Sequence, residues 1–283
     1  MIIPARWYAG GKGLDEFRSE MLNDDRIREL HDYPNAADCF SGVEIKGGVC
    51  YFLWDREYNG CCKIVSHSGR EIKSVMSRPL LEENCQTFIR YNEAIDILRK
   101  VRAKKERSFS ERVFSAKTFG FRTYFTKFDI DSEDFNKTKE EVILLYANHA
   151  QGYMYRKSFS AGKEYLDSWK IFIPEAIGSG NMATDELKPI LGKPKSACTE
   201  TYIMNGPYAS EQEAANAMTY IRTKFFHFML GLKKNTQHTT KAVYQFVPMQ
   251  DFSKPWTDEE LYKKYGLTQE EIDFIESMIK PME

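Results

Sequence analysis

The longest amphipathic segment of the chain runs from Ser210 to Lys234. Its apolar residues recur at the spacing of a buried helical stripe: Ala214, Ala217, Met218, Ile221, Phe225, Phe228, Met229 and Leu232. Ser210 and Glu213 have the spacing of a capping box, and Lys233 lies near the end of the segment, where the helix dipole favours cations. The pattern predicts one long helix with a buried face.

Shorter apolar or alternating runs predict the strands. These runs cover residues 2–7, 24–33, 47–54, 61–67, 142–147, 152–157, 169–174, 196–204 and 242–248. Helical spacing predicts further helices over residues 14–22, 92–105, 258–265 and 269–279. Tyr58-Asn59-Gly60 is a turn signal and predicts a hairpin between the third and fourth runs, while Asn205-Gly206-Pro207 predicts a turn. Together these elements predict an α+β fold.

The elements divide the chain into three predicted segments. Residues 1–75 hold a helix and a few strands, and they look like the tail of a larger α/β sheet. Residues 76–107 form a predicted linker around a helix whose C-terminal half is basic. Residues 108–283 form a predicted second domain of mixed α/β type that ends in two short helices.

Charge is unevenly distributed along a chain that is nearly neutral. The 283 residues are 42% hydrophobic, which supports a folded core, and their formal net charge is −1. Basic residues outnumber acidic ones between Gln86 and Lys127, and from Ser108 to Phe128 they alternate with aromatic residues. A basic, aromatic surface suits a nucleic-acid partner, although a solvated basic helix and an ordinary aromatic core fit the same pattern.

Several function classes lack their sequence signals. No apolar run approaches the roughly 18 residues of a membrane span, and no charged leader precedes an apolar block as in a signal peptide. The six cysteines include no C-x-x-C pair, which favours reduced thiols over zinc ligands. We therefore expect a soluble cytoplasmic protein without a membrane partner.

Catalytic and metal-binding motifs are few as well. The five histidines form no H-x-x-x-H or HExxH pattern, so no metal site is expected, and no G-x-S-x-G sequence occurs. Gly10-Gly11-Lys12-Gly13 matches neither of the nucleotide-binding motifs G-x-x-x-x-G-K-[ST] and G-x-G-x-x-G, and is more consistent with a tight turn. Lys12 and the N–H groups of that turn could contact a DNA phosphate. On residues alone, the sequence favours a binding module over an enzyme.

Two sets of segments carry a family resemblance. Residues 2–7 and 40–54 resemble the late catalytic motifs of adenine-N6 DNA methyltransferases, in the subgroup found in bifunctional type II restriction–modification enzymes. The second set is similar to the target-recognition domain of those proteins: residues 169–174, 178–180, 200–202, 213–216, 220–226, 234–237, 246–252 and 256–262. The resemblance covers most of the chain and is weakest in the middle, where such proteins read different DNA sequences.

The resemblance implies a fold and a division of labour. The chain would be the C-terminal fragment of a Rossmann-like methyltransferase sheet followed by a mixed α/β target-recognition domain. The early glycine motif of the family and its Asn/Asp-Pro-Pro-Tyr/Phe motif do not occur in this sequence. The resemblance therefore implies that this chain binds no cofactor and is inactive alone, whereas the full-length enzyme uses S-adenosylmethionine. The implied partners are double-stranded DNA and an N-terminal methylase region, with or without a nuclease.

The resemblance also assigns candidate contacts. Phe40 matches the family position that packs against a flipped adenine, with a loop anchor in the core as the alternative. The candidate DNA contacts are Lys12, Lys46, Lys117, Arg122, Arg156, Lys157, Lys170, Arg222, Lys224, Lys234, Thr236 and Gln237. Each of these cations could instead be a solvated side chain. An alternative function is a stand-alone specificity subunit that serves separate methylase and nuclease chains, although such subunits usually carry two recognition domains and no internal repeat is present here.

Overall fold

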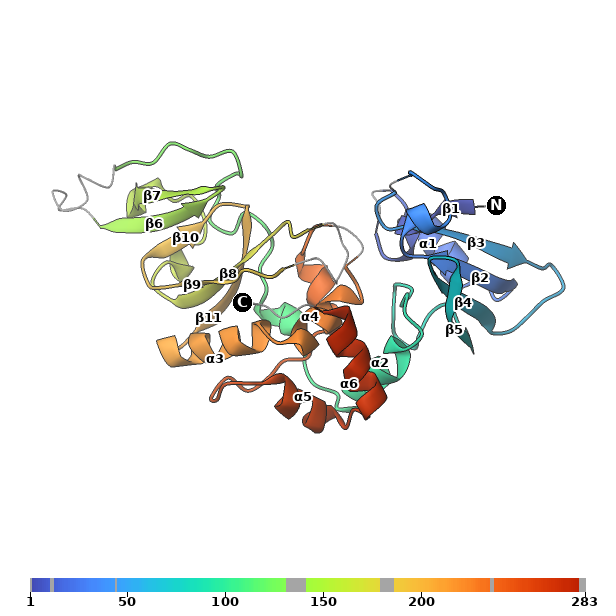
Figure 1. Ribbon diagram of the computed structural model, residues 1–283. Coiled ribbons are helices and arrows are strands. Elements are labelled where there is room, and N and C mark those ends of the chain that lie inside the picture. The colour runs from blue at the N-terminus through green and yellow to red at the C-terminus, as the bar shows by residue number, and fades with distance from the viewer. Residues whose placement is uncertain are drawn as a thin grey trace.

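The computed structural model describes residues 2–10, 13–43, 45–130, 141–178, 186–234 and 237–279. The fold is mixed α+β, as predicted. A five-stranded sheet from the N-terminal part of the chain lies on one side of the molecule, and a larger body of small sheets and helices lies on the other (Figure 1). Within the described ranges, no helix is both long enough and apolar enough to cross a membrane.

The N-terminal sheet has the strand order β1-β3-β2-β4-β5. Its strands are β1 (Ile2–Pro4), β2 (Ile27–Tyr33), β3 (Val49–Trp54), β4 (Cys62–Ser68) and β5 (Glu71–Arg78). The short helices of this part are η1 (Ala5–Tyr8), α1 (Asp15–Leu22) and η2 (Ala36–Asp38). Trp7, Tyr8 and Leu22 from the helices pack with Leu30 and Ile64 on one face of the sheet. The helices thus cover one face of the N-terminal sheet, and the strand ends and loops lie at the surface.

The predicted hairpin between the third and fourth runs is wrong. β3 pairs with β1 and β2, whereas β4 pairs with β2 in parallel and with β5 in antiparallel orientation. β2 therefore lies between the two strands that the turn signal appeared to join. β4 is buried along most of its length, which is the pattern of a central strand that needs a hydrogen-bonded neighbour on each edge. β5, which the sequence did not predict, supplies the second neighbour.

The larger body contains two three-stranded sheets, ordered β10-β6-β7 and β11-β8-β9. Their strands are β6 (Val142–Ala147), β7 (Ala150–Tyr155), β8 (Trp169–Pro174), β9 (Ile190–Gly192), β10 (Ser196–Cys198) and β11 (Tyr202–Tyr208). The helices are α2 (Ala94–Ala103), η3 (Phe109–Arg112), η5 (Arg156–Ser158), η6 (Lys163–Tyr165), α3 (Glu211–Ile221), α4 (Lys224–Gly231), η7 (Lys241–Phe246), α5 (Asp258–Tyr265) and α6 (Gln269–Met278). The runs over 142–147 and 169–174 form strands with the predicted bounds.

Helix α2 is part of the main core. Its side chains Ile95, Leu98 and Val101 are buried in one cluster with Phe228 of α4 and Ile275 of α6. Figure 1 places α2 beside α6, beneath the N-terminal sheet. The helix that was predicted to lie in a linker is therefore packed into the larger body.

The predicted long helix is in fact two helices, because the chain breaks at Arg222 and Thr223. The Thr223 hydroxyl accepts a hydrogen bond from the Phe226 N–H, and the Asp258 carboxylate accepts from the N–H groups of Lys224 and Phe225 at 3.0 and 2.8 Å. These acceptors satisfy N–H groups that a continuous helix would have bonded internally. A side chain about 35 positions away in the sequence thus helps to begin α4, which local periodicity cannot reveal.

Other local predictions also differ from the structure. Residues 2–7 were predicted as one strand, but β1 ends at Pro4 and the 3₁₀ helix η1 follows. Residues 196–204 were predicted as one strand, but β10 ends at Cys198 and β11 begins at Tyr202.

Residues 242–248 were predicted as a strand, but most of them form the 3₁₀ helix η7. Asn205-Gly206-Pro207 was predicted as a turn, but it lies inside β11, at an irregularity in the pairing with β8. A short apolar run does not distinguish a strand from a helix, and turn-forming residues also occur at β-bulges.

Candidate nucleic-acid interface

Phe40 lies on the surface of the N-terminal part. It follows η2, and its backbone N–H donates to the Ala36 carbonyl at 2.8 Å while its carbonyl accepts from the Val43 N–H at 3.1 Å. The side chain is 40% exposed. An aromatic ring with that exposure is not a core anchor, so the structure leaves the ring available to a ligand.

A buried ion pair holds the base of the Phe40 loop. Asp32 of β2 is 0% exposed and binds the Arg90 guanidinium through two hydrogen bonds of 2.7 and 2.8 Å. The same guanidinium donates to the Gly47 carbonyl at 2.7 Å. Burial alone would lower the pKa of Arg90, but the charge of Asp32 and its hydrogen bonds raise it above the usual value. Arg90 therefore ties the loop to the sheet as a permanent cation.

Two further features fix the same loop. Asp38 accepts hydrogen bonds from the Gly69 N–H at 2.8 Å and from the Asn35 side-chain amide at 3.0 Å. Gly48 has a φ of +76°, and a Cβ there would collide with the Tyr33 carbonyl. Lys46 is exposed beside this fixed point. Lys12, the other predicted phosphate contact of this part, lies outside the described residues.

Four candidates in the larger body have side chains that reach solvent. Arg222 is exposed at the C-terminal end of α3, and Gln237 is exposed beyond α4. Arg122 is exposed and forms an ion pair with Glu200 at 3.3 Å. Lys157 is exposed, and its ammonium lies 4.9 Å from the centre of the Tyr155 ring. These positions are compatible with contacts to a large ligand.

Lys117 is half-buried, with a positive φ of 68°. Lysine at such a backbone angle is unusual, since the left-handed region favours glycine. Thr236 lies outside the described residues. The structure therefore adds no contact for either candidate.

Lys170 and Lys234 are buried and serve the fold instead. Lys170 is 0% exposed, and its ammonium donates to the carbonyls of Tyr165, Leu166 and Ser168 at 2.9, 3.1 and 2.8 Å. Burial lowers the pKa of Lys170 to about 8. Lys234 is 4% exposed and donates to the Ile177 carbonyl at 2.9 Å. Neither ammonium can reach DNA without local unfolding of the residues around it. Lys170 and Lys234 are therefore not DNA contacts in this fold, contrary to the prediction.

Arg156 and Lys224 are engaged by carboxylates. Arg156 binds Asp167 with hydrogen bonds of 2.9 and 2.5 Å, and these bonds raise the pKa of the guanidinium. Lys224 of α4 forms an ion pair with Glu276 of α6. A phosphate would have to displace these partners, so both residues are better explained as links between elements of the fold.

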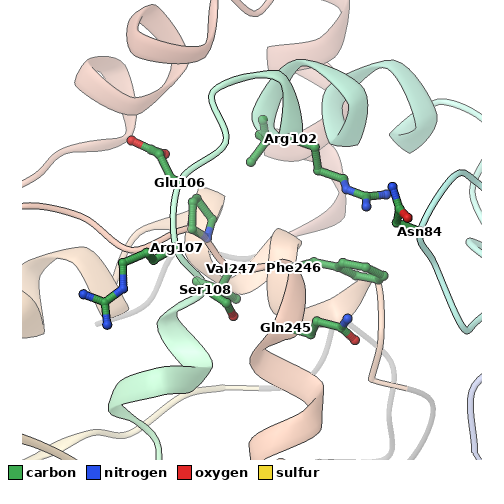
Figure 2. A pocket seen from close by; sticks show the side chains of 10 residues that line it. Asn84, Arg102, Glu106, Arg107, Ser108, Gln245, Phe246 and Val247 are labelled. Atoms are coloured by element: carbon green, nitrogen blue, oxygen red, sulfur yellow. The ribbon is translucent and has the colours of Figure 1, made fainter.

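A pocket that no sequence pattern indicated lies between the end of α2 and η7. Figure 2 shows Arg102, Glu106, Arg107, Gln245 and Phe246 around it. Arg102 donates to the Glu83 carbonyl and to the Cys85 sulfur, and Arg107 forms an ion pair with Glu111. The cations of this pocket thus already have protein partners. Among the described residues, no group of three or more His, Cys, Asp and Glu side chains is placed to hold a metal ion.

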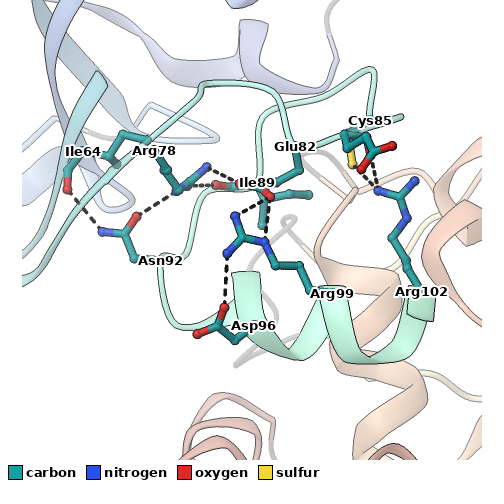
Figure 3. A network of polar contacts seen from close by, with 10 residues as sticks. Ile64, Arg78, Glu82, Cys85, Ile89, Asn92, Asp96, Arg99 and Arg102 are labelled. Atoms are coloured by element: carbon teal, nitrogen blue, oxygen red, sulfur yellow. Dashed lines mark hydrogen bonds and ion pairs between the residues drawn. The ribbon is translucent and has the colours of Figure 1, made fainter. Parts of the chain in front are cut away.

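A polar network joins the N-terminal sheet to α2 (Figure 3). Arg78, the last residue of β5, is 2% exposed; it donates to the Asn92 side chain at 3.2 Å and to the Ile89 carbonyl. Asn92 in turn donates to the Ile64 carbonyl of β4 at 3.2 Å. Arg99 of α2 binds the buried carboxylate of Glu82. Burial lowers the pKa of Arg78 to about 10, and the charge of Glu82 opposes that effect.

Three known proteins or families are similar to this chain. Residues 1–40 match the family model described as Eco57I restriction-modification methylase. Over 75 residues the chain is 35% identical to an uncharacterized adenine-specific methylase of Mycoplasma pneumoniae. That alignment covers 26% of this chain and 18% of the relative, so the chain spans less than a fifth of the relative it matches.

A solved structure, the type IIG restriction endonuclease BpuSI, aligns with 94% of this chain and 42% of its own, at 11% identity and a TM-score of 0.33. That score is too low to establish a common fold. The two sequence matches confirm, over the residues they cover, the predicted resemblance to adenine-specific methylases of restriction–modification systems.

Proposed function

We propose that the chain recognises a specific sequence in double-stranded DNA as part of an adenine-specific DNA methyltransferase of a restriction–modification system. The observation that carries the proposal is the match of residues 1–40 to a restriction-modification methylase. That match ends at Phe40, whose ring is exposed and whose loop is fixed by Asp32 and Arg90. A match to a methylase also favours this function over a stand-alone specificity subunit.

In this proposal the two parts of the molecule have different roles. Residues 1–75 are the C-terminal portion of a Rossmann-like methyltransferase domain, and Phe40 packs against the extruded adenine, which has lost its stacking neighbours. Lys46 and Lys12 contact phosphates. Residues 76–107 connect this portion to a target-recognition domain, residues 108–283. Its candidate contacts to DNA are Lys117, Arg122, Lys157, Arg222, Thr236 and Gln237.

The methyl donor belongs to the larger enzyme. An adenine methylase of this kind uses S-adenosylmethionine, which supplies the transferred methyl group. The carboxylates that hold the Phe40 loop are already used by the fold: Asp32 binds Arg90, and Asp38 binds Gly69 and Asn35. These residues do not fit a cofactor site. We therefore assign the cofactor and the transfer step to an N-terminal methylase region, and propose that this chain is inactive alone.

Selection from a randomised duplex pool tests the proposal. The purified chain is incubated with the pool, bound duplexes are recovered and amplified, and the sequences are compared after several rounds. We expect enrichment of one short motif that contains an adenine. A pool that stays random, although the chain is folded, would contradict sequence-specific recognition by this chain.

A pair of charge variants tests the phosphate contact at Lys46. Lys46→Gln should reduce the slope of log K against log salt concentration by about one, since each phosphate contact releases about one counterion. Lys63→Gln is the matched control, because it removes the same charge from the same N-terminal part of the chain but Lys63 is already paired with Glu29 at 2.9 Å. Equal slopes for both variants and the wild type would exclude the contact.

A further inference from the structure

The segment from Phe119 to Phe128 is anchored by its phenylalanines. Phe119 is 0% exposed, and Phe121, Phe125 and Phe128 are partly buried against the same core cluster. The ring of Phe121 lies 4.7 Å from that of Phe125 and 5.2 Å from that of Phe159. Aromatic contacts at these distances bury large apolar areas, so the loop has a fixed position on the β6–β8 side of the larger body.

Hydrogen bonds define the tip of this loop. The Phe125 N–H donates to the Arg122 carbonyl at 3.1 Å, which closes a turn with Thr123 and Tyr124 at its centre. Glu200 binds the first half of the turn: its N–H donates to the Phe121 carbonyl at 2.9 Å, and its carboxylate accepts from the Thr123 N–H at 3.2 Å. The turn is therefore held both by its own hydrogen bond and by a neighbouring segment.

Tyr124 projects from this fixed turn into solvent. It is 81% exposed, more than any other exposed large hydrophobic residue in the described part of the chain; Ile72 follows with 61%. An aromatic side chain on a pre-organised backbone loses little conformational freedom when it binds, which is why tyrosine is frequent at binding hot spots. The position of this ring resembles a contact residue more than a packing residue.

The surroundings of Tyr124 favour an anionic ligand. Arg122 and Lys127 in the same loop are exposed, and Lys117 lies at its start. Among the described residues, the acids Glu200 and Asp129 adjoin the loop, and both are committed to the fold: Glu200 binds Thr123 and pairs with Arg122 at 3.3 Å, and Asp129 accepts from the Tyr155 N–H at 2.9 Å. A flat aromatic ring among cations suits duplex DNA, in which thymine methyl groups are exposed in the major groove beside the phosphates.

We propose that Tyr124 contacts a base of the target sequence through its ring and so contributes to sequence specificity. This inference rests on the proposed function, since it assigns a specificity residue to the same DNA complex. Tyr124 carries no charge, so it adds discrimination between sequences without adding to the counterions released by phosphate contacts. A change in sequence discrimination without a change in salt dependence therefore distinguishes a base contact from a phosphate contact.

The test compares Tyr124→Ala, Tyr124→Phe and the wild type. Ile72→Ala, which removes another exposed apolar side chain from the N-terminal sheet, is the matched control. Affinities are measured by fluorescence anisotropy for the duplex selected by the wild type and for a scrambled duplex, over a salt series. Thermal unfolding of each variant is measured in parallel, and we expect little change because both side chains are exposed.

For Tyr124→Ala we expect affinity for the selected duplex to fall by about 5- to 100-fold, with the scrambled duplex and the salt slope unaffected. Tyr124→Phe keeps the ring and should remain within about threefold of the wild type on the selected duplex. Three results would each overturn the ring contact. The first is that Tyr124→Ala discriminates between the two duplexes as well as the wild type does, and the second is that it loses affinity equally for both. The third is that Tyr124→Phe loses discrimination along with Tyr124→Ala. If the wild type itself does not discriminate, the proposed function fails, whereas these three results leave it standing.

Discussion

At the scale of single residues, Arg90 determines how Phe40 is presented. Its guanidinium joins β2, through Asp32, to the carbonyl of Gly47 on the loop that follows Phe40. Asp32 is fully buried, and burying a charge is costly unless the charge is paired and hydrogen-bonded. The geometry of the proposed base contact thus depends on a pair that does not itself touch DNA.

We predict that Arg90→Met destabilises the protein by about 3–5 kcal/mol, because it leaves the buried charge of Asp32 without its partner. Denaturant unfolding measures the effect. The double variant Asp32→Asn with Arg90→Met should be less destabilised than the sum of the single variants, since the two residues interact directly. If Arg90→Met unfolds within about 1 kcal/mol of the wild type, the ion pair is not what holds the loop.

Lys170 predicts a pH dependence of stability. Burial lowers the pKa of its ammonium in the folded protein to about 8, from an ordinary value of 10.5. Between these two values the unfolded chain binds more protons than the folded one, so the contribution of Lys170 to the free energy of unfolding increases as pH rises. At about 1.4 kcal/mol per pKa unit, the increase is on the order of 3 kcal/mol.

The measurement compares the wild type with Lys170→Met from pH 7.5 to 10.5. The stability of the wild type relative to Lys170→Met should increase across this range, because Lys170 titrates whereas methionine does not. A difference that stays constant with pH would show that the ammonium has an ordinary pKa in the folded state.

At the scale of elements, the break between α3 and α4 depends on caps. Thr223→Ala should reduce stability by about 1–2 kcal/mol, because its hydroxyl accepts from the Phe226 N–H at the start of α4. Thr240 is a matched control, since it precedes η7 without a side-chain capping bond. Thr240→Ala should therefore be nearly neutral. Equal effects of the two substitutions in chemical denaturation would contradict a capping role for Thr223.

The elements that the sequence predicted well are those with a strong local pattern. β6 and β8 are compact apolar runs, and Pro174 ends the second of them, while Thr268 caps α6 with a capping box. β5 has its apolar residues Ile72 and Val75 exposed, so it carries no signal of burial. The pairing of β2 with β4 was not predictable because it joins segments that no local turn connects.

At the scale of the whole molecule, two bodies are joined by contacts that the sequence did not reveal. Arg78, Asn92 and Ile64 connect the N-terminal sheet to the start of α2, as Figure 3 shows. Lys100 of α2 also binds Glu271 of α6 at 2.6 Å. In the proposed function, Phe40 on one body and the recognition residues on the other act on the same DNA, and these contacts connect the two bodies.

The candidate site was partly predictable, because residue type indicates chemistry whereas burial depends on the fold. The sequence predicted Phe40 and Lys46 as contacts, and both side chains are accessible, as a contact requires. The sequence also predicted Lys170 and Lys234 as DNA contacts, but both are buried. Lys170 lies in the apolar strand β8, a context that itself favours burial. Lys234 donates a hydrogen bond to the Ile177 carbonyl. Folding brings distant carbonyls to these ammonium groups, and no spacing rule indicates which ones.

The central claim is that this chain distinguishes one DNA sequence from others. Its most direct test is the ratio of dissociation constants for the selected duplex and a scrambled duplex of the same composition, measured by anisotropy at about 0.1 M salt. We predict a ratio of about 1,000 or more in favour of the selected duplex, as for specific DNA-binding proteins in general. A ratio below about ten, with tight but salt-sensitive binding to both duplexes, would mean that the chain contacts only phosphates and would contradict the account.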